Sequence, residues 1–518
     1  MSLISKFASV GGATMASRVL GFARETMIAG LLGAGPVADA FYAAFRFPNL
    51  FRRLFAEGAF NAAFIPLFSK ELENGGRDAA RAFAEQILSV LILVLLVLSA
   101  LAIIFAPYLV GTIIAPKFAA DPEKFELTTL LTRIMFPYLA AMSLVAMLSG
   151  ILNAFRKYFL AALAPVLLNV VLIGILFFCW ANNFTPRDIG VWMAWGVALS
   201  GLLQLGLLIR GVVNEGFPLS LRMPTLSAPV KRLLVLAVPT AIAGGITQIN
   251  LLVGQIIASA QDGAIAVMNF ADRLVQLPLG VIAIAIGVVL LPELSRALAA
   301  GDKKEASFLQ NRSLEFGLGL TVPAAVGLFM IPLPLVALVY ERGAFVRETS
   351  EITANVLAAF AIGLPSFVLI KIFQPYFYAR EDMRTPMWFS GLNAVLNIVL
   401  ALSLFPVYGV VGLAIATSTA GWANAFGLAI WLQIKGELNL AKSTIKNTIL
   451  ILIASGVMAV VLYFGQNMFG ADLVDLAILS RAGLVFGLIG FAAAVYFAIV
   501  ILSGAIPKQD LKRLIGKR

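Results

Sequence analysis

The chain has 518 residues, of which 61% are hydrophobic and only 13% are charged, with a formal net charge of +11. A soluble globular protein carries about 25% charged residues, so the composition excludes that class and indicates an integral membrane protein. Apolar stretches of about 20 residues or more recur along the chain, which predicts helical spans and not a β-barrel of short alternating strands. We therefore predict an all-α polytopic membrane protein.

Charge and reactive side chains narrow the function further. In a membrane protein the positive-inside rule explains basic loops without a nucleic-acid partner, so we expect none. The sequence has no His and a single Cys, Cys179, which excludes Cys/His metal sites, intrachain disulfides and Ser-His or Cys-His nucleophile pairs. It also lacks a P-loop motif. We expect no enzyme activity, no catalytic residue, no metal site and no bound cofactor.

Fourteen apolar spans follow one another along the chain, with boundaries that are loose by a few residues. They cover 5–33, 37–69, 80–113, 126–154, 158–180, 188–211, 230–260, 264–297, 306–339, 351–378, 385–405, 408–434, 443–467 and 480–504. The loops after even-numbered spans, and the tail after residue 504, are rich in Lys and Arg, whereas the opposite loops are poor in them. This bias predicts that both termini are cytoplasmic.

Two short matches indicate an internal repeat. Residues 60–72 align with 286–298 at an offset of 226, and residues 166–173 align with 394–401 at an offset of 228. They predict two six-span units in the same orientation, related by a pseudo-twofold axis along the membrane normal, as in parallel-repeat transporters. The predicted lobes are 1–215 and 216–436. Residues 437–518 would add two more spans and a basic cytoplasmic tail.

The first two spans carry charges that do not belong in lipid. They are Arg18, Arg24, Glu25, Asp39, Arg46, Arg52, Arg53 and Glu57. One charge at a helix centre costs about 2.5–3.5 kcal/mol, so several unpaired Arg would cost on the order of 10 kcal/mol. These side chains must face water, carboxylates or an anionic ligand. Ion pairing and snorkelling are the structural alternatives, and they suit Arg46 and Arg53 better than Arg24.

The second bundle has a charged element of its own, Asp272 and Arg273, near the repeat equivalent of the Arg46 region. Arg from two facing half-bundles suits an anion between them, because guanidinium binds phosphate oxygens in a bidentate manner and stays charged. We interpret Arg46, Arg53, Glu57 and Asp272 as gating or supporting residues.

Other polar residues in the second bundle leave alternatives open. Asn250, Asn393, Asn397 and Thr417 suit hydrogen bonds between helices or a weak cation site that lacks a carboxylate. Glu341 and Arg342 begin an external loop, where they either gate that face or are simply solvated.

Several motifs resemble the MurJ (MviN) lipid II flippases of the MOP exporter superfamily. They are SRVLGFARE at 17–25, ADAFYAAFRFPNLFRRLFAEGAF at 38–60, IPLFSKE at 65–71, RIMFPY at 133–138, ILNAFRKY at 151–158, ADRL at 271–274 and LLPELSR at 290–296. The resemblance covers essentially the whole chain. It implies two six-helix lobes around a central cationic cavity, with a groove for a polyprenyl tail formed by the last two spans.

The resemblance also implies a cargo, lipid II, which is undecaprenyl-pyrophosphoryl-MurNAc-pentapeptide-GlcNAc. It would move from the cytoplasmic to the periplasmic leaflet of a bacterial inner membrane, for peptidoglycan synthesis. The family's functional residues fall on Arg18, Arg24, Glu25, Asp39, Arg52 and Arg273, with Arg24 and Arg273 approaching the pyrophosphate from the two lobes. Some members have a sodium site built partly on Asp, whereas only Asn and Thr candidates occur here.

The mechanism implied is alternating access, coupled to membrane potential or to a monovalent cation. Its partners would be lipid II, membrane lipids and the peptidoglycan synthesis and division machinery. Two alternatives stay open. One is an exporter of another lipid-linked oligosaccharide or of drugs on the same fold, and the other is a membrane scaffold or receptor with structural Arg.

Overall fold

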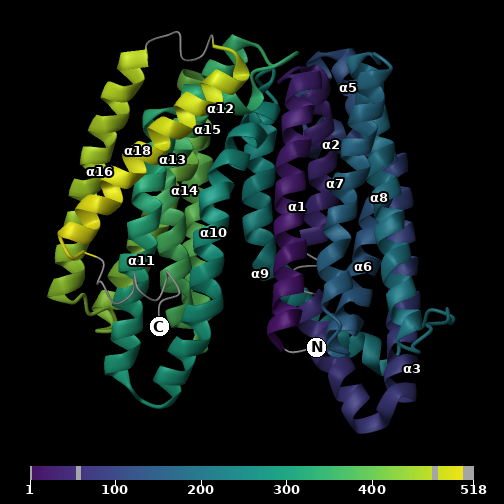
Figure 1. Cartoon of the computed structure of the whole chain (residues 1–518). Coiled ribbons are helices and arrows are strands. Elements are labelled where there is room, and N and C mark those ends of the chain that lie inside the picture. Colours follow the sequence, from purple (N-terminus) through teal and green to yellow (C-terminus); the bar gives the residue numbers. More distant parts are fainter. Residues whose placement is uncertain (1–2, 54–59, 470–475, 506–518) are drawn as a thin grey trace. The chain divides into compact units, whose positions relative to one another are not determined.

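The computed structural model describes residues 3–53, 60–469 and 476–505 of the chain. The described residues form helices joined by turns, and no β-strand occurs among them (Figure 1). By their contacts, the residues group into two compact units, Met1–Ala266 and Val267–Arg518. The predicted all-α fold class is confirmed.

Both units are bundles of long helices. The first contains α1 (Leu3–Leu32), α2 (Pro36–Arg52), α3 (Phe60–Ile104), α4 (Ala106–Leu109), η2 (Val110–Ile114), η3 (Pro116–Ala120), α5 (Pro122–Met135), α6 (Pro137–Ala154), α7 (Phe159–Ala181), α8 (Pro186–Asn214) and α9 (Ala228–Ala258). The second contains most of α10 (Ala264–Ala299), then α11 (Lys303–Met330), α12 (Pro332–Tyr340), α13 (Arg347–Tyr378), α14 (Arg384–Tyr408), α15 (Val410–Ile434), α16 (Lys442–Phe469) and α18 (Ile478–Leu502).

Proline sets many of the helix boundaries. The first residues of α2, α5, α6 and α8 are Pro36, Pro122, Pro137 and Pro186. Proline suits the first turn because its φ is already helical and the missing N–H has no partner there in any case. The predicted span 126–154 is therefore two helices, broken at Pro137. In the same way the predicted span 306–339 is broken at Pro332, where α12 begins.

The second and third predicted spans differ in extent from the helices. Helix α2 ends at Arg52, residues 54–59 lie outside the described part, and α3 begins at Phe60. Within the bounds of α3, two helical segments meet at Gly76, whose φ of 71° suits a residue without a side chain. The predicted loop between these spans is thus a turn at Gly76.

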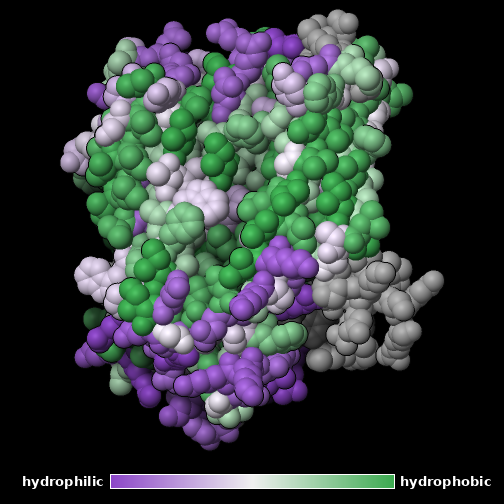
Figure 2. Space-filling model, turned by 90° about the vertical axis from the view of Figure 1, so that its left-hand side faces the viewer, coloured by the Kyte–Doolittle hydropathy of each residue, from purple (hydrophilic) through white to green (hydrophobic). Residues whose placement is uncertain are grey.

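Ten helical segments among the described residues are long and apolar enough to cross a membrane. They correspond in order to ten of the fourteen predicted spans. Of the other four predicted spans, 5–33 corresponds to α1, 37–69 to α2 and the start of α3, 230–260 to α9, and 264–297 to α10. Figure 2 shows one face on which hydrophobic residues form a broad band between hydrophilic ends, as expected for a surface in contact with lipid.

Small residues bring helices of the second unit close together. A Cβ added to Gly363 on α13 would lie 2.5 Å from the Ser418 Oγ on α15. One added to Gly421 on α15 would lie 2.6 Å from the Ser366 Oγ on α13. Because lipid provides little hydrophobic drive for helix association, such close backbone contact is a main source of packing energy in membranes. Helices α13 and α15 are therefore closely packed within this unit.

The lobe limits predicted from the repeat, 1–215, 216–436 and 437–518, stay predictions. Packing groups α9 with the first unit, where it contacts α3 and η2. The two units are defined by contacts between residues, so they do not test whether the chain contains a repeat.

Candidate functional site

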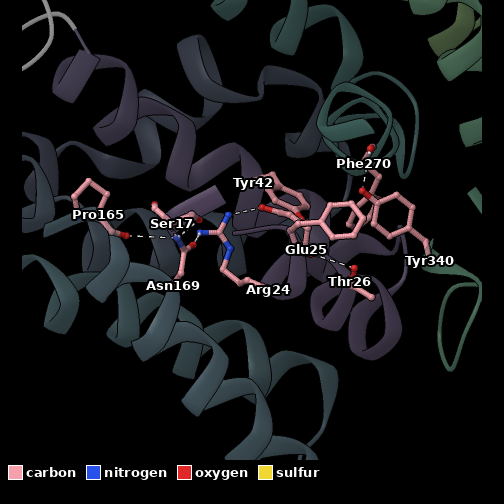
Figure 3. Close-up of polar contacts among 10 residues, drawn as sticks. Ser17, Arg24, Glu25, Thr26, Tyr42, Pro165, Asn169, Phe270 and Tyr340 are labelled. Atoms are coloured by element: carbon pink, nitrogen blue, oxygen red, sulfur yellow. Dashed lines mark hydrogen bonds and ion pairs between the residues drawn. The ribbon is translucent and has the colours of Figure 1, made fainter. Parts of the chain in front are cut away.

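Arg24 lies in the core of the first unit, where its residue surface is only 8% exposed. Its guanidinium donates from Nη1 to Asn169 Oδ1 on α7 at 2.9 Å and forms an ion pair through Nη2 with Glu25 (Figure 3). The Tyr42 hydroxyl on α2 donates to the other oxygen of Glu25. One charged network therefore links α1, α2 and α7.

Asn169 orients this network. Its Nδ2 donates to the backbone oxygen of Ser17 at 3.0 Å, which fixes the amide so that Oδ1 faces Arg24 (Figure 3). The side-chain orientation of an amide follows from its hydrogen-bond network in this way. Asn169 lies in the repeat match of residues 166–173, but sequence analysis missed its contact with Arg24. A polar amide inside the apolar span 158–180 was the available signal.

Arg24 retains hydrogen-bonding capacity. A guanidinium carries five N–H donors. The Nε atom is buried and has no acceptor among the described residues. A buried donor without an acceptor is costly, and an anion with several oxygens is the natural group to satisfy it. The site thus has the chemistry to exchange Glu25 and Asn169 for the oxygens of a phosphate.

Asp39 belongs to a different network, whose described contacts share no residue with those described for Arg24. Its carboxylate is fully buried and accepts from Lys124 Nζ at 2.8 Å, Gly263 N at 2.8 Å and Ala266 N at 2.9 Å. The last two are backbone groups at the start of α10, which have no partner within their own helix. Asp39 therefore caps α10 from another helix, because Gly263 has no side chain with which to do so.

Lys124 completes the Asp39 network. Asp121 caps the N-terminus of α5 and so fixes the turn that carries Lys124. The Lys124 side chain is 2% exposed, contacts Asp262 at 2.9 Å and lies 4.1 Å from the centre of the Phe118 ring. Sequence analysis missed Lys124 and Asp262, since each pairs with a residue far away in the chain. That Asp39 binds cargo stays a prediction; in this structure its carboxylate accepts from three donors.

The other predicted residues of the first unit are more dispersed. Arg18 is exposed on α1, and Arg53 is exposed at the end of α2. Arg46 is half-buried, with Nη1 3.5 Å from the Leu251 oxygen on α9. Arg52 lies on α2, but its side chain is outside the described part, as is all of Glu57.

In the second unit, Asp272 is exposed on α10 and accepts a hydrogen bond from Gln276 one turn later. Arg273 beside it is half-buried. The structure brings together Arg24 and Glu25 from the predicted set. The predicted approach of Arg24 and Arg273 to one pyrophosphate stays a prediction.

Of the candidates for a weak cation site, Thr417 forms a hydrogen bond within its own helix, from its Oγ1 to the Leu413 oxygen at 2.9 Å. Among the described residues, no group of three or more His, Cys, Asp or Glu side chains could hold a metal ion.

An apolar groove with a cavity volume of about 520 Å³ lies between α16 and α18 in the second unit. Its lining consists of Val460, Val461, Phe464, Gly465, Met468, Gly483, Leu484, Gly487, Leu488 and Phe491. Gly483 and Gly487 are one turn apart on α18, and a Cβ at either would meet nothing within 4 Å. Their missing side chains keep one wall of the groove open. Its place is the one that the resemblance assigns to a polyprenyl tail.

The chain matches known proteins over nearly its whole length. The model of the family "Lipid II flippase MurJ" matches residues 28–480. The probable lipid II flippase MurJ of Rhizobium tropici is 48% identical over 519 residues, covering 100% of this chain and 97% of the relative. The lipid II flippase MurJ of Burkholderia cenocepacia is 34% identical over 509 residues, covering 97% of this chain and 98% of the relative.

Solved structures of similar proteins also match the fold of this chain. A lipid II flippase MurJ in an inward closed conformation matches with a TM-score of 0.78 and 25% identity, covering 95% of this chain and 99% of that one. An inward-facing multidrug resistance MATE family transporter of the MOP superfamily has a TM-score of 0.67 and 15% identity, covering 83% and 97%, which shows the fold alone. The chain therefore belongs to the MurJ lipid II flippase family and is a multi-pass membrane protein with the MOP-type fold.

Proposed function

We propose that this chain flips lipid II from the cytoplasmic to the periplasmic leaflet of a bacterial inner membrane, the cargo that its relatives are named for. The observation that carries the proposal is the Arg24 network. A guanidinium inside a membrane bundle, held by Asn169 and paired with Glu25, is suited to an anionic group that must cross the membrane. The pyrophosphate of lipid II is such a group.

Binding would proceed by exchange of anions. An unpaired buried charge costs several kcal/mol, and Glu25 removes this cost while no cargo is bound. A pyrophosphate oxygen would take over Nη2 from Glu25, with Nε available to a second oxygen. Tyr42 would hold the displaced Glu25 by its hydroxyl and so keep a second charge from being left without a partner. No bond of the cargo is made or broken.

The tail of the cargo would follow a separate path. An undecaprenyl chain is apolar, so it would stay in the groove between α16 and α18 while the headgroup passes through a cationic cavity by alternating access. With both termini cytoplasmic, the membrane potential favours outward movement of the anion by about 2.3 kcal/mol per charge per 100 mV. We propose this potential, or a monovalent cation gradient, as the energy source. Consumption of lipid II by the peptidoglycan synthesis and division machinery would keep transport outward.

The rival function on the same fold is export of another lipid-linked oligosaccharide or of drugs. A buried Arg disfavours the cationic compounds that drug exporters usually carry, because like charges repel at short distance. Another lipid-linked oligosaccharide shares the pyrophosphate and differs only in its sugars. Cargo assays must therefore vary the sugar and peptide part.

The test is a leaflet-accessibility assay for lipid II in a bacterium depleted of its own flippase and supplied with this chain. We expect lipid II to become accessible from the periplasm with the wild-type chain and to stay inaccessible with Arg24→Gln. Arg187→Gln is the matched control, because Arg187 pairs with Glu126 at an exposed position. Failure of the wild-type chain to restore accessibility would overturn the proposed function.

A further inference from the structure

A second apolar pocket, with a cavity volume of about 310 Å³, lies where the first turns of α16 meet α11, α13 and α15 in the second unit. Apart from Thr444 and Thr448, every residue that lines it is apolar. It shares no lining residue with the groove between α16 and α18, which uses the other half of α16. Its volume is at the lower end of the range of about 300–1,000 Å³ that is usual for ligand pockets. We call it the α11–α16 pocket.

Hydrogen bonds hold the connection between α15 and α16 against α11. Asn311 Nδ2 on α11 donates to the Asn439 oxygen at 2.8 Å, and Asn311 Oδ1 accepts from Ala441 N at 3.0 Å. Thr444 Oγ1, in the first turn of α16, donates to the buried Glu315 on α11 at 2.8 Å. Polar contacts thus fix one wall of the α11–α16 pocket, and its interior is left to apolar side chains.

The α11–α16 pocket opens sideways to the bilayer. Leu314 and Phe373 form its buried inner wall, whereas Ile445 and Ile449 line it and are half-exposed. Apolar side chains exposed on a membrane-spanning helix face lipid. Helix α16 is long and apolar enough to be such a helix, and it lies on the side of the second unit that Figure 2 shows, where hydrophobic residues form a band. A lipid chain in the bilayer can therefore reach the pocket.

Lys442 places a positive charge at the end of this opening. It is exposed, and it precedes Ile445 by three residues and Ile449 by seven, so it follows the same stripe of α16. A Lys at the end of a span extends its ammonium into the headgroup region while its methylene groups stay on apolar surface. The topology predicted from the loop charges assigns this end of α16 to the cytoplasmic surface. The opening therefore combines an apolar interior with a cation at the level of lipid phosphates.

Thr448 is the polar group inside the α11–α16 pocket. The Thr444 hydroxyl donates to Glu315, whereas the Thr448 hydroxyl, one turn further along α16, has no hydrogen-bond partner among the described residues. A glycerolipid carries ester carbonyls between its phosphate and its acyl chains, and a hydroxyl can donate to such an oxygen. A polyprenyl phosphate has no carbonyl at that position. Lys442 and Thr448 together therefore fit a phospholipid better than a polyprenyl lipid.

We propose that the α11–α16 pocket binds one acyl chain of a membrane phospholipid, whose phosphodiester lies at Lys442 and whose ester carbonyl accepts from Thr448. This inference goes beyond the proposed function and does not depend on the identity of the cargo. The bound chain would fill the space between α16 and the inner helices of the second unit. Since α16 also forms one wall of the groove between α16 and α18, the phospholipid would hold that wall in place.

The test is native mass spectrometry of the purified full chain, delipidated in detergent and then titrated with dioleoyl-phosphatidylglycerol or dioleoyl-phosphatidylethanolamine. We expect one molecule of either lipid to bind more tightly than the rest. Ala429→Phe fills the pocket and should weaken this binding about tenfold. Gly487→Phe, which fills the groove between α16 and α18 instead, is the matched control and should change it less than about twofold. Loss of binding in Gly487→Phe and not in Ala429→Phe overturns the inference, as does the lack of a tightly bound lipid on the wild-type chain.

Two further variants test the polar contacts without adding bulk. We expect Thr448→Val to weaken binding of both ester lipids about threefold and to leave binding of the dioleyl ether analogue of phosphatidylglycerol unchanged, because that analogue has no ester carbonyl. Lys442→Gln should weaken binding of both headgroups about threefold, since each carries a phosphodiester. Lys304→Gln, at an exposed position in the first turn of α11, is its control. Unchanged phospholipid binding in both Thr448→Val and Lys442→Gln overturns the inference, and so does equal weakening of the ester and ether lipids by Thr448→Val.

Undecaprenyl phosphate is the remaining probe, because it separates a phospholipid site from a second site for the cargo's tail. We expect the part of its binding that Ala429→Phe removes to be about tenfold weaker than that of either phospholipid. Tighter binding that is lost in Ala429→Phe would assign the pocket to polyprenyl chains and overturn the inference. The leaflet assay for the proposed function is independent, since it measures transport of lipid II and not phospholipid binding.

Discussion

The first unit contains two networks of buried charged residues, one around Asp39 and one around Arg24, and they differ in how completely their hydrogen bonds are satisfied. Asp39 is satisfied by Lys124 and by two backbone N–H groups at the start of α10. Arg24 has the partners Asn169 and Glu25 but keeps a buried Nε without an acceptor among the described residues. A fully satisfied charge holds structural elements in place, whereas a charge with spare donors can accept a ligand. The difference lies in hydrogen-bond satisfaction and not in burial.

Reversing the charge of Arg24 should have the largest effect. Arg24→Glu places a second carboxylate beside Glu25 and removes the guanidinium. We therefore expect lipid II flipping to fall more than about 100-fold, which corresponds to a loss of about 2.8 kcal/mol or more. Complementation of a flippase-depleted strain measures it, with the protein level checked in membranes. Arg24→Lys keeps the charge but loses the bidentate geometry, so it should retain partial activity. Full activity of Arg24→Glu would contradict an anion site at this position.

Neutralising Asp39 should chiefly affect stability. Among the described residues, Asp39→Asn leaves the buried Lys124 with only the exposed Asp262 as an ionic partner, and it weakens the cap of α10. Loss of one partner of a buried pair costs about 3 kcal/mol or more. Thermal unfolding of the purified protein in detergent measures it. Asp262→Asn is the control and should leave the melting temperature unchanged, since that side chain is 90% exposed. An unchanged melting temperature for Asp39→Asn would contradict the structural role of the Asp39 network.

The turn before α10 offers a smaller test of the Asp39 network. Gly263 has φ of 75°, and a Cβ there would lie 2.5 Å from the Ala34 oxygen. Gly263→Ala should therefore cost about 1–2 kcal/mol from the backbone conformation alone, with a further cost from this clash. Gly301→Ala is the matched control, because Gly301 has φ of 72° and a Cβ there would meet nothing within 4 Å. Equal melting temperatures for the two variants would show that the close contact between the Gly263 turn and Ala34 does not contribute to stability.

The sequence was sufficient to predict the all-α fold class and the ten spans that match apolar helices of membrane-crossing length. It also identified the charged stretch around Arg24. Sequence analysis considered ion pairs with the carboxylates of this stretch as one alternative, but it did not identify which residues pair. Arg24 pairs with Glu25, its direct neighbour, whereas helix periodicity points to partners three or four residues away. Lys124 lay just before the predicted span 126–154 and would have been assigned to a loop, yet it is buried against Asp39 from a residue 85 positions earlier. Such pairings depend on tertiary packing, which periodicity does not encode.

Asn169 provides the smallest and most specific test of the Arg24 network. Asn169→Ala removes the acceptor at 2.9 Å from Arg24 Nη1 and the link to Ser17, but it leaves the ion pair with Glu25. A hydrogen bond to a charged group contributes about 1.5–3 kcal/mol, part of which Glu25 would recover. We therefore expect flipping to fall about tenfold in the leaflet assay. Asn182→Ala, an exposed Asn at the end of the same helix, should flip normally. If both variants transport lipid II equally well, Arg24 does not need Asn169 for its orientation, and the geometry of the site depends on Glu25 and Tyr42.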